Sequence, residues 1–275
     1  MIQKPGRSRK SLHNSCSELH ASGGYNETML RLLCIAAHPD DEAGNFGGCL
    51  QLYADRGVET CVVCLTPGQA ATNRGGARND AELAAMRRKE FAEACRILKV
   101  TKPFVLDYPD GQLHRIEPQK VVCELVLKIR EFRPQVLMTF GAEGGVTGHT
   151  DHSMASVFAT LAFHWAGRNN RYPDQLHEKL PAHRIQKLYH ATANFSLPGR
   201  PAVTPAAETA VIEVGEYLET KLAAFRAHVT QAPLFQTFES RMREYGGQER
   251  FHLAASVWHD TPRRETDLFE GVEDA

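Results

Sequence analysis

The sequence predicts an α/β fold, in which a doubly wound, mostly parallel sheet carries helices on both faces. Between residues 32 and 165, short apolar runs alternate with longer stretches of helical periodicity. Chains of this alternating kind form parallel sheets whose crossover connections are right-handed. No internal repeat and no linker-like break interrupts the pattern. We therefore expect one Rossmann-like domain with an irregular C-terminal extension.

The first part of the chain should contain strands and helices in strict alternation. The expected strands are Leu32–Ala36, Thr60–Leu65, Phe104–Asp107 and Val136–Phe140. The helices that follow them are expected at 43–55, Asp80–Leu98, Pro118–Phe132 and 151–165. In a sheet of order 3-2-1-4, the first and fourth strands are neighbours, and a crevice opens at their carboxyl ends.

Residues after 168 follow a less regular pattern. We expect strands at Lys187–Ala191 and Thr209–Val214, a helix at Tyr217–Gln231, and a solvent-facing helical surface at Arg241–Arg250. Lys221 and His228 should then share one face of a helix, where they pack or close a cleft.

The expected domain spans residues 29–261. Residues 1–28 are polar and lack both periodicity and the apolar segment of a secretory signal, so we expect a disordered arm. Residues 262–275 are charged, and we expect this tail to fray.

The composition is that of an ordinary soluble globular protein, with 42% hydrophobic and 24% charged residues. A net charge of −1 gives no overall field that would recruit nucleic acid or an anionic membrane. No stretch reaches the ~18 apolar residues of a membrane-spanning helix. The seven cysteines have no regular spacing, and Cys61 and Cys64 fall within a strand, so both should be core residues. A cytoplasmic protein is expected, and a homo-oligomer is compatible with this composition.

The stretch His38-Pro39-Asp40-Asp41-Glu42 places one imidazole and three carboxylates in the turn after the first strand. Like charges packed this closely repel, and a divalent cation would make the cluster tolerable. The alternative is an exposed acidic loop in which Asp40 or Asp41 caps the next helix.

A second cluster, Gly148-His149-Thr150-Asp151-His152, follows the fourth strand. Taken alone, it could be a pair of surface histidines at a helix start. The predicted sheet order brings both clusters into one crevice, however. His38, Asp41 and His152 would then form an open site for a catalytic divalent metal.

These two motifs resemble those of the PIG-L/LmbE-like zinc-dependent N-acetylglucosamine deacetylases. The similarity runs from about Met29 to Gln231 and includes Arg87-Arg88-Lys89-Glu90, Tyr108-Pro109-Asp110-Gly111, and Lys221 with His228-Val229-Thr230-Gln231. The resemblance implies hydrolysis of a small-molecule N-acyl amino sugar, with no nucleic acid or membrane as partner.

The resemblance also implies roles for individual residues. His38, Asp41 and His152 would be ligands of one Zn²⁺ per chain, although other divalent ions could take its place. Asp40 would be the general base, and His149 would face the developing oxyanion. Arg87 and Asp110 fall where such enzymes contact substrate.

The chain departs from the family pattern at two places. Thr150 stands where many members have proline, which should matter little because that residue binds no metal. Val146 and Thr147 stand where some members have a tyrosine, so a step assisted by a phenol is in doubt.

The spacing of the motif separates the two aspartates. His38 and Asp41 are three residues apart, which lets both face a common point at a helix start. Asp40 is then left to accept a proton from water. Gly68, Arg74 and Arg78, in the loop between the second strand and its helix, could bind a polar part of the substrate or simply be solvated.

Two other classes of function remain open from the sequence. A non-catalytic nucleotide- or sugar-binding module could use the same fold, but the first turn lacks G-x-G-x-x-G and its carboxylates would repel a pyrophosphate. A metal-dependent phosphoesterase is the other alternative, although such sites usually hold two metals and more ligands than can be placed here.

Overall fold

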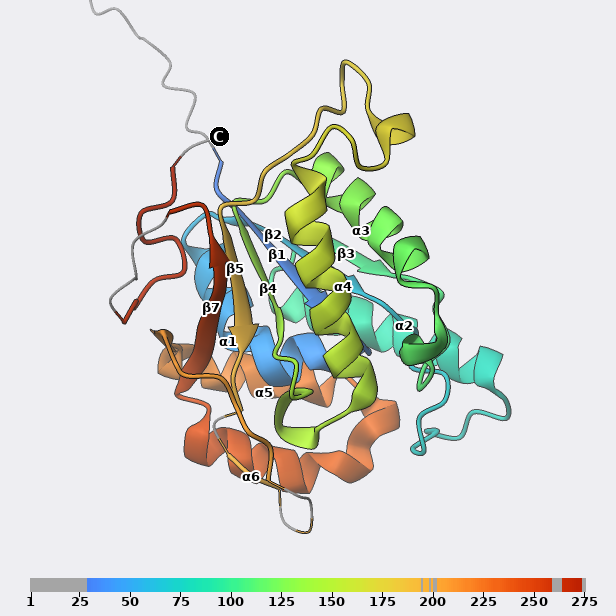
Figure 1. The fold of residues 1–275 in the computed structure, drawn as a ribbon. Coiled ribbons are helices and arrows are strands. Elements are labelled where there is room, and N and C mark those ends of the chain that lie inside the picture. Colours follow the sequence, from blue (N-terminus) through green and yellow to red (C-terminus); the bar gives the residue numbers. More distant parts are fainter. Residues whose placement is uncertain (1–28, 194, 198, 200–201, 259–263, 274–275) are drawn as a thin grey trace, which may run out of the picture.

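The computed structural model describes residues 29–193, 195–197, 199, 202–258 and 264–273. Its seven strands form one sheet of order β3-β2-β1-β4-β5-β7-β6 (Figure 1). The predicted order 3-2-1-4 for the first part of the chain is confirmed. The expected disordered arm, residues 1–28, lies outside the described residues.

Five strands run parallel, and two at one edge make the sheet mixed. The parallel strands are β1 (Arg31–Ala36), β2 (Glu59–Cys64), β3 (Lys102–Val105), β4 (Val136–Phe140) and β5 (Lys187–Ala191). Strand β7 (Gln248–Ser256) is antiparallel to both β5 and β6 (Ala210–Glu213). The predicted mostly parallel sheet is therefore confirmed.

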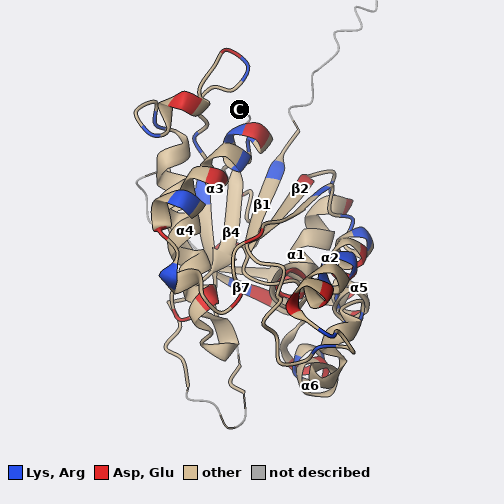
Figure 2. Ribbon diagram, turned by 90° about the vertical axis from the view of Figure 1, so that its right-hand side faces the viewer, with Lys and Arg blue, Asp and Glu red and all other residues tan. Residues whose placement is uncertain are grey.

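Helices cover both faces of the sheet, as expected for a doubly wound fold. Helices α3 (Pro118–Phe132) and α4 (Thr150–Ala166) pack together on one face. On the other face, α5 (Leu218–Arg226) packs against α1 (Asp41–Asp55) and α2 (Asp80–Ile97) (Figure 2). Helix α6 (Phe235–Tyr245) lies against α5.

The core lies on both faces of the central strands. Residues Leu32 to Ala36 of β1 are all almost fully buried, which explains their continuous apolar sequence. Cys61 and Cys64 are free, buried thiols, and the prediction that they are core residues is confirmed. No helix in the described part of the chain combines the length and apolar character needed to cross a membrane.

The second half of the chain differs from the predicted elements in two places. The predicted helix Tyr217–Gln231 is wrong in extent, because α5 ends at Arg226 and a 3-10 turn at Val229–Leu234 contains Pro233. The predicted helical surface Arg241–Arg250 is wrong in its latter part, because α6 ends before Gly246 and β7 begins at Gln248. Lys221 and His228 are therefore not on one helix, although both are buried.

The described part of the predicted tail is ordered against the domain. Leu268 is fully buried, and Glu265 lies 2.6 Å from the ammonium group of Lys187. The hydroxyl of Tyr189 also donates to Glu265. The expectation of a frayed tail is wrong for residues 264–273, because an apolar side chain and a buried ion pair anchor them.

Candidate active site

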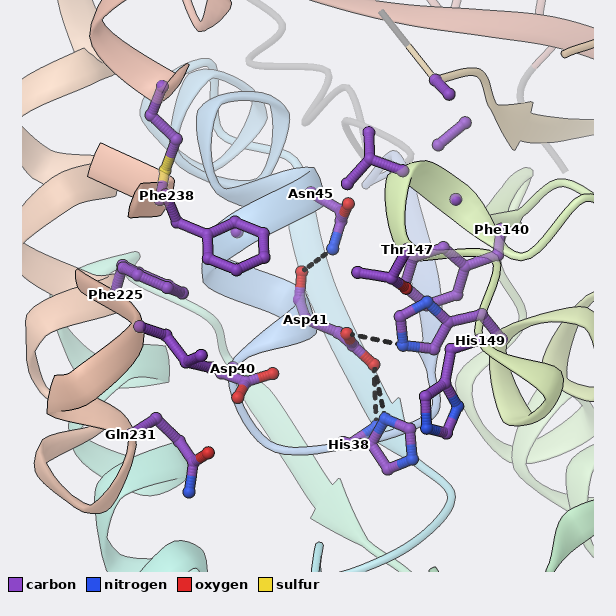
Figure 3. Close-up of a pocket in the computed structure, with 18 of the residues that line it drawn as sticks. His38, Asp40, Asp41, Asn45, Phe140, Thr147, His149, Phe225, Gln231 and Phe238 are labelled. Carbon is purple, nitrogen blue, oxygen red and sulfur yellow. Dashed lines mark hydrogen bonds and ion pairs between the residues drawn. The ribbon is translucent and has the colours of Figure 1, made fainter. Parts of the chain in front are cut away.

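A cavity of about 440 Å³ opens at the carboxyl ends of β1 and β4, where the sheet order reverses. His38, Asp40 and Asp41 follow β1, while His149 and His152 stand at the start of α4. All five line the cavity (Figure 3). The structure thus brings together the two motifs that the sequence places more than a hundred residues apart.

Asp41 lies between two imidazoles. Its Oδ1 is 3.1 Å from Nε2 of His152, and its Oδ2 is 3.6 Å from Nδ1 of His38. The backbone N–H groups of Ala37 and His38 both donate to Oδ2 and fix the carboxylate at the start of α1. Burial alone would raise the pKa of Asp41, but His152 and His38 hold it well below its ordinary value. Asp41 is therefore an ionised, buried carboxylate.

Hydrogen bonds assign the protons on these two imidazoles. Nδ1 of His152 lies 3.1 Å from the carbonyl oxygen of Gly144, which can only accept, so this nitrogen carries the proton. Nε2 of His38 lies 3.0 Å from the carboxylate of Asp110 and is likewise the donor. The other ring nitrogens, Nε2 of His152 and Nδ1 of His38, both face Asp41. Two imidazoles that converge on a carboxylate form a donor set that suits a divalent metal.

Two further carboxylates surround His38. Asp110 lies 3.0 Å and Asp151 3.4 Å from its Nε2. Burial lowers the pKa of His38, but Asp110, Asp151 and Asp41 outweigh this effect and raise it well above the ordinary value. Metal-binding histidines commonly donate their second N–H to a carboxylate in this way. Asp151 was not predicted as a site residue, although its place between His149 and His152 was a signal for it.

Two groups of described residues bring potential ligand atoms close together. The donor atoms of His38, His149 and His152 lie within 4.8 Å of one another, and so do those of His38, Asp110 and Asp151. Both groups contain His38, but neither contains Asp41. Asp41 instead contacts His38 and His152 directly, so the predicted ligand triad of His38, Asp41 and His152 stays a prediction.

His149 has the tautomer that suits a hydrogen-bond donor to substrate. Its Nδ1 accepts the backbone N–H of Asp151 at 3.2 Å, which leaves the proton of the neutral ring on Nε2. Burial lowers the pKa of His149, and the neighbouring His38 and His152 lower it further. The imidazole that lines the cavity is therefore neutral and carries a proton on Nε2.

Asp40 has a backbone conformation that side chains rarely adopt, with φ of 115°. Such a conformation costs ~1–3 kcal/mol and persists only where the surroundings enforce it. The Asp40 N–H donates to Glu42 Oε2 at 3.0 Å, and the Asp40 carbonyl accepts from Gly44 N–H at 2.8 Å. As expected, the side chains of the two successive aspartates diverge, and only Asp41 contacts the imidazoles (Figure 3).

Arg87 holds the carboxylate of Asp40. Its Nη2 lies 2.8 Å from Asp40 Oδ2 and also donates to the carbonyl of Pro39, while Nη1 donates to Gly68. Burial raises the pKa of Asp40 to about 6, although Arg87 opposes the shift. Arg87 and Asp110 both line the cavity, but each already has polar partners in the protein. Their contact with substrate stays a prediction.

The carboxylate of Glu42 is held in turn by His228 from the second half of the chain. Nε2 of His228 lies 2.7 Å from Glu42 Oε1, and both side chains are fully buried. His228 has a ψ of 64°, outside helical geometry, and lies just after the end of α5, where the predicted helix would have continued. His228 therefore supports the group that holds the Asp40 amide.

A second buried pair joins α1 to the second half of the chain. The ammonium group of Lys221 lies 2.6 Å from Glu249, whose two oxygens accept the N–H groups of Gly48 and Cys49. A Cβ atom at Gly48 would lie 2.7 Å from Val214 and 2.9 Å from Glu249. Only glycine therefore allows this close approach.

The loop after β2 contributes to the cavity through Ala70, Ala71 and Thr72. Its arginines bind elsewhere, since Arg74 pairs with Asp80 and Arg78 with Glu82. Val146 and Thr147 also line the cavity. No tyrosine is found among the described residues that line the cavity.

Comparisons with known proteins identify a family and several relatives that the chain is similar to. A family model described as "PIG-L: GlcNAc-PI de-N-acetylase" matches residues 33–163. The chain is 29% identical to a mycothiol S-conjugate amidase of Streptomyces coelicolor, over 90% of this chain and 98% of the relative. It is 30% identical to a 1D-myo-inositol 2-acetamido-2-deoxy-alpha-D-glucopyranoside deacetylase of Catenulispora acidiphila, over 88% and 97% of the two chains.

The fold is also similar to that of a solved structure, the N,N'-diacetylchitobiose deacetylase of Pyrococcus horikoshii. The TM-score is 0.67 at 23% identity, and the match covers 84% of this chain and 86% of that one. At this identity the likeness is evidence for the fold alone.

Proposed function

The chain belongs to the PIG-L family of de-N-acetylases, and from this premise we propose how its cavity hydrolyses an amide. The protein is a hydrolase that removes N-acetyl groups from N-acetylglucosamine-type amino sugars. The single observation that carries the mechanism is the arrangement around Asp41. Two imidazole nitrogens face this carboxylate, and Asp40 stands beside it in a strained conformation.

Deacetylases of this family depend on a metal ion, and the donor set here fits one. We assign His38, Asp41 and His152 as the ligands of one Zn²⁺ per chain, because two neutral imidazoles and a carboxylate make an open zinc site. The chemistry that zinc supplies when bound is Lewis acidity, which lowers the pKa of water toward ~7 and polarises a carbonyl. Asp110 and Asp151 would orient His38 through its Nε2–H.

Asp40 is the proposed general base. Its carboxylate lines the cavity, and with a pKa of about 6 it is largely ionised at neutral pH yet still able to hold a proton. It would accept a proton from the attacking water while Arg87 keeps its orientation. The same carboxyl group could then return the proton to the departing amine.

His149 is the proposed donor to the oxyanion. Its Nε2–H is available because Nδ1 accepts from the backbone, and the low pKa keeps the ring neutral before reaction. A preorganised donor of this kind typically contributes ~10²–10³ in rate. The tyrosine that some family members offer is absent from the described lining, so His149 would fill this role without a phenol.

The proposed function is tested by incubating zinc-loaded protein with N-acetylglucosamine conjugates and measuring the free amine. We expect about one zinc per chain by elemental analysis, and both zinc and activity should be lost in His38→Ala and His152→Ala. If both variants kept full zinc occupancy, His38 and His152 would not be the zinc ligands. Cleavage of phosphodiesters without amide turnover would instead favour a phosphoesterase.

A further inference from the structure

Beyond the His/Asp cluster, the cavity continues along side chains from the second half of the chain. Phe225 and Phe238 lie across the cavity from Thr147 and His149 (Figure 3). The centres of the two phenyl rings are 6.0 Å apart. We define the apolar wall by four residues of α5, α6 and the turn between them, namely Phe225, Leu234, Phe238 and Met242.

The charges of the cavity are unfavourable for an anionic substituent. Among the described residues that line it, each lysine and arginine is already paired with a carboxylate. Arg87 pairs with Asp40 at 2.8 Å, Lys221 with Glu249 at 2.6 Å, and Arg250 with Glu208 at 2.7 Å. A phosphate or carboxylate bound here would find no unpaired cation, and it would face Asp40 and Glu249.

Two polar side chains of the cavity lining, Gln248 and Arg250, also form hydrogen bonds within the protein. Gln248 lines the cavity and donates to Glu213 at 2.5 Å, and Arg250 donates to Gln248 at 3.0 Å as well as to Glu208. A second sugar ring carries several hydroxyl groups that need partners once they leave water. An apolar group makes no such demand and gains from burial.

We propose that the substrate is a neutral N-acetylglucosamine glycoside whose aglycone is an aryl or alkyl group packed against the apolar wall. The inference rests on the proposed function, because the sugar ring must place its acetamide at the His/Asp cluster. A cavity of about 440 Å³ falls within the ~300–1,000 Å³ of pockets that hold drug-sized ligands. It therefore has room for the sugar together with a substituent of this kind.

The test compares kcat/KM for amine release by the zinc-loaded full chain on four compounds. They are N-acetylglucosamine, its phenyl β-glycoside, N,N'-diacetylchitobiose and N-acetylglucosamine 1-phosphate. We expect the phenyl glycoside to exceed the free sugar by ~10- to 100-fold, since even small apolar groups discriminate strongly in a fitted pocket. The phosphate should be the poorest of the four.

Substitutions test whether the preference for the phenyl glycoside arises from the apolar wall. Phe238→Ala should lower the ratio of kcat/KM between phenyl glycoside and free sugar by ~10-fold, and Phe238→Leu should restore most of it. Val229→Ala is the matched control, because Val229 is 66% exposed and lies outside the cavity lining. It should keep the wild-type ratio.

Binding separates failure of this inference from failure of the proposed function. If none of the four compounds releases amine, the proposed deacetylase activity is rejected. Calorimetric Kd values for the same compounds would still show whether the apolar wall binds the aglycone. Tighter binding of the phenyl glycoside than of the free sugar, weakened by Phe238→Ala, supports the inference. A preference for diacetylchitobiose or for the phosphate, or equal affinity for phenyl glycoside and free sugar, overturns it.

Discussion

The two halves of the chain contribute differently to the same cavity. Residues 31–166 supply all of the predicted site residues, each in the loop that follows a strand or in the helix after that loop. Residues 187–273 supply the apolar wall and the buried partners His228 and Lys221. The chemical groups thus come from turns close in sequence to their strands. The groups that position and enclose them come from far along the chain.

The largest expected effect concerns the first half alone and separates its two adjacent aspartates. Asp40→Asn should keep zinc and fold but lose ~10²–10⁴-fold in kcat, because it removes the general base. Asp41→Asn should lose zinc, because it weakens a ligand between His38 and His152. Elemental analysis and turnover measure both. Loss of zinc in the Asp40 variant and its retention in the Asp41 variant would reverse the two assignments.

Most of the first half could be predicted from the sequence. Helix α3 and strand β4 have the predicted bounds, and α2 ends one residue before the predicted Leu98. Buried parallel strands appear as continuous apolar runs, and their turns carry the functional side chains. Asp151 was missed because a carboxylate near a helix start is also an ordinary N-cap.

The second half was predicted less well because its structure depends on distant partners. Strand β7 mixes charged and apolar residues, and its Glu249 is buried only because it meets Lys221 and two amides of α1. The tail is anchored by the pairing of Glu265 with Lys187 across 78 residues of sequence. Neither partner can be identified from local periodicity.

Two buried ion pairs across α1 allow the comparison between halves to be tested directly. Glu42–His228 adjoins the Asp40 amide, whereas Glu249–Lys221 binds the amides of Gly48 and Cys49 further along the helix. His228→Ala should lower kcat by ~10–100-fold, as loss of an outer-shell partner often does. His228→Gln should recover part of this loss, because its amide can donate to Glu42.

Lys221→Met is the matched change in the other pair. It leaves Glu249 buried without its cation, which costs ~3–5 kcal/mol in the free energy of unfolding. We expect its kcat, corrected for the folded fraction, to fall much less than that of His228→Ala. Urea unfolding and kcat are measured on the same preparations. Equal losses of kcat in both variants would show that His228 affects the site no more than any other buried pair across α1 does. An unchanged kcat in both would show that the second half only stabilises the fold.

The tail should affect stability without affecting chemistry. Leu268 is fully buried, and the neighbouring Asp267 binds Tyr53 and Arg56 at the end of α1 opposite to Asp41. Leu268→Ala should lower the free energy of unfolding by ~2–5 kcal/mol, because it leaves a cavity in the core. The kcat of the folded protein should stay within about twofold of wild type. A larger fall in kcat for Leu268→Ala would show that the tail acts on the site.

Removal of residues 1–28 tests whether the N-terminal arm, unlike the C-terminal tail, is dispensable for stability. A chain that begins at Met29 should match the full chain in both thermal midpoint and activity, since the arm has neither hydrophobic periodicity nor an apolar segment. A large fall in either quantity would show that the arm packs on the domain.

A pH-dependent effect on stability alone is expected at the seam between the halves, where His183 follows α4 and precedes β5. Its Nε2–H donates to the carbonyl of Pro134 at 2.7 Å, and burial lowers its pKa to about 4. The unfolded chain, with a pKa near ~6.5, therefore takes up this proton first as the pH falls. The stability from this group is fully present above pH ~6.5 and decreases toward pH 4.

Between pH 7.5 and pH 5, this histidine should remove about 2 kcal/mol from the free energy of unfolding. His183→Gln keeps a donor for Pro134 but has no group that titrates in this range. Between pH 7.5 and pH 5, its free energy of unfolding should therefore fall by about 2 kcal/mol less than that of the wild type. Urea unfolding at the two pH values measures both slopes. The carboxylates titrate alike in the two proteins. The difference between the two slopes therefore measures the contribution of His183 alone. Identical slopes would mean that His183 takes up its proton without unfolding, and that the halves stay joined in acid by other contacts.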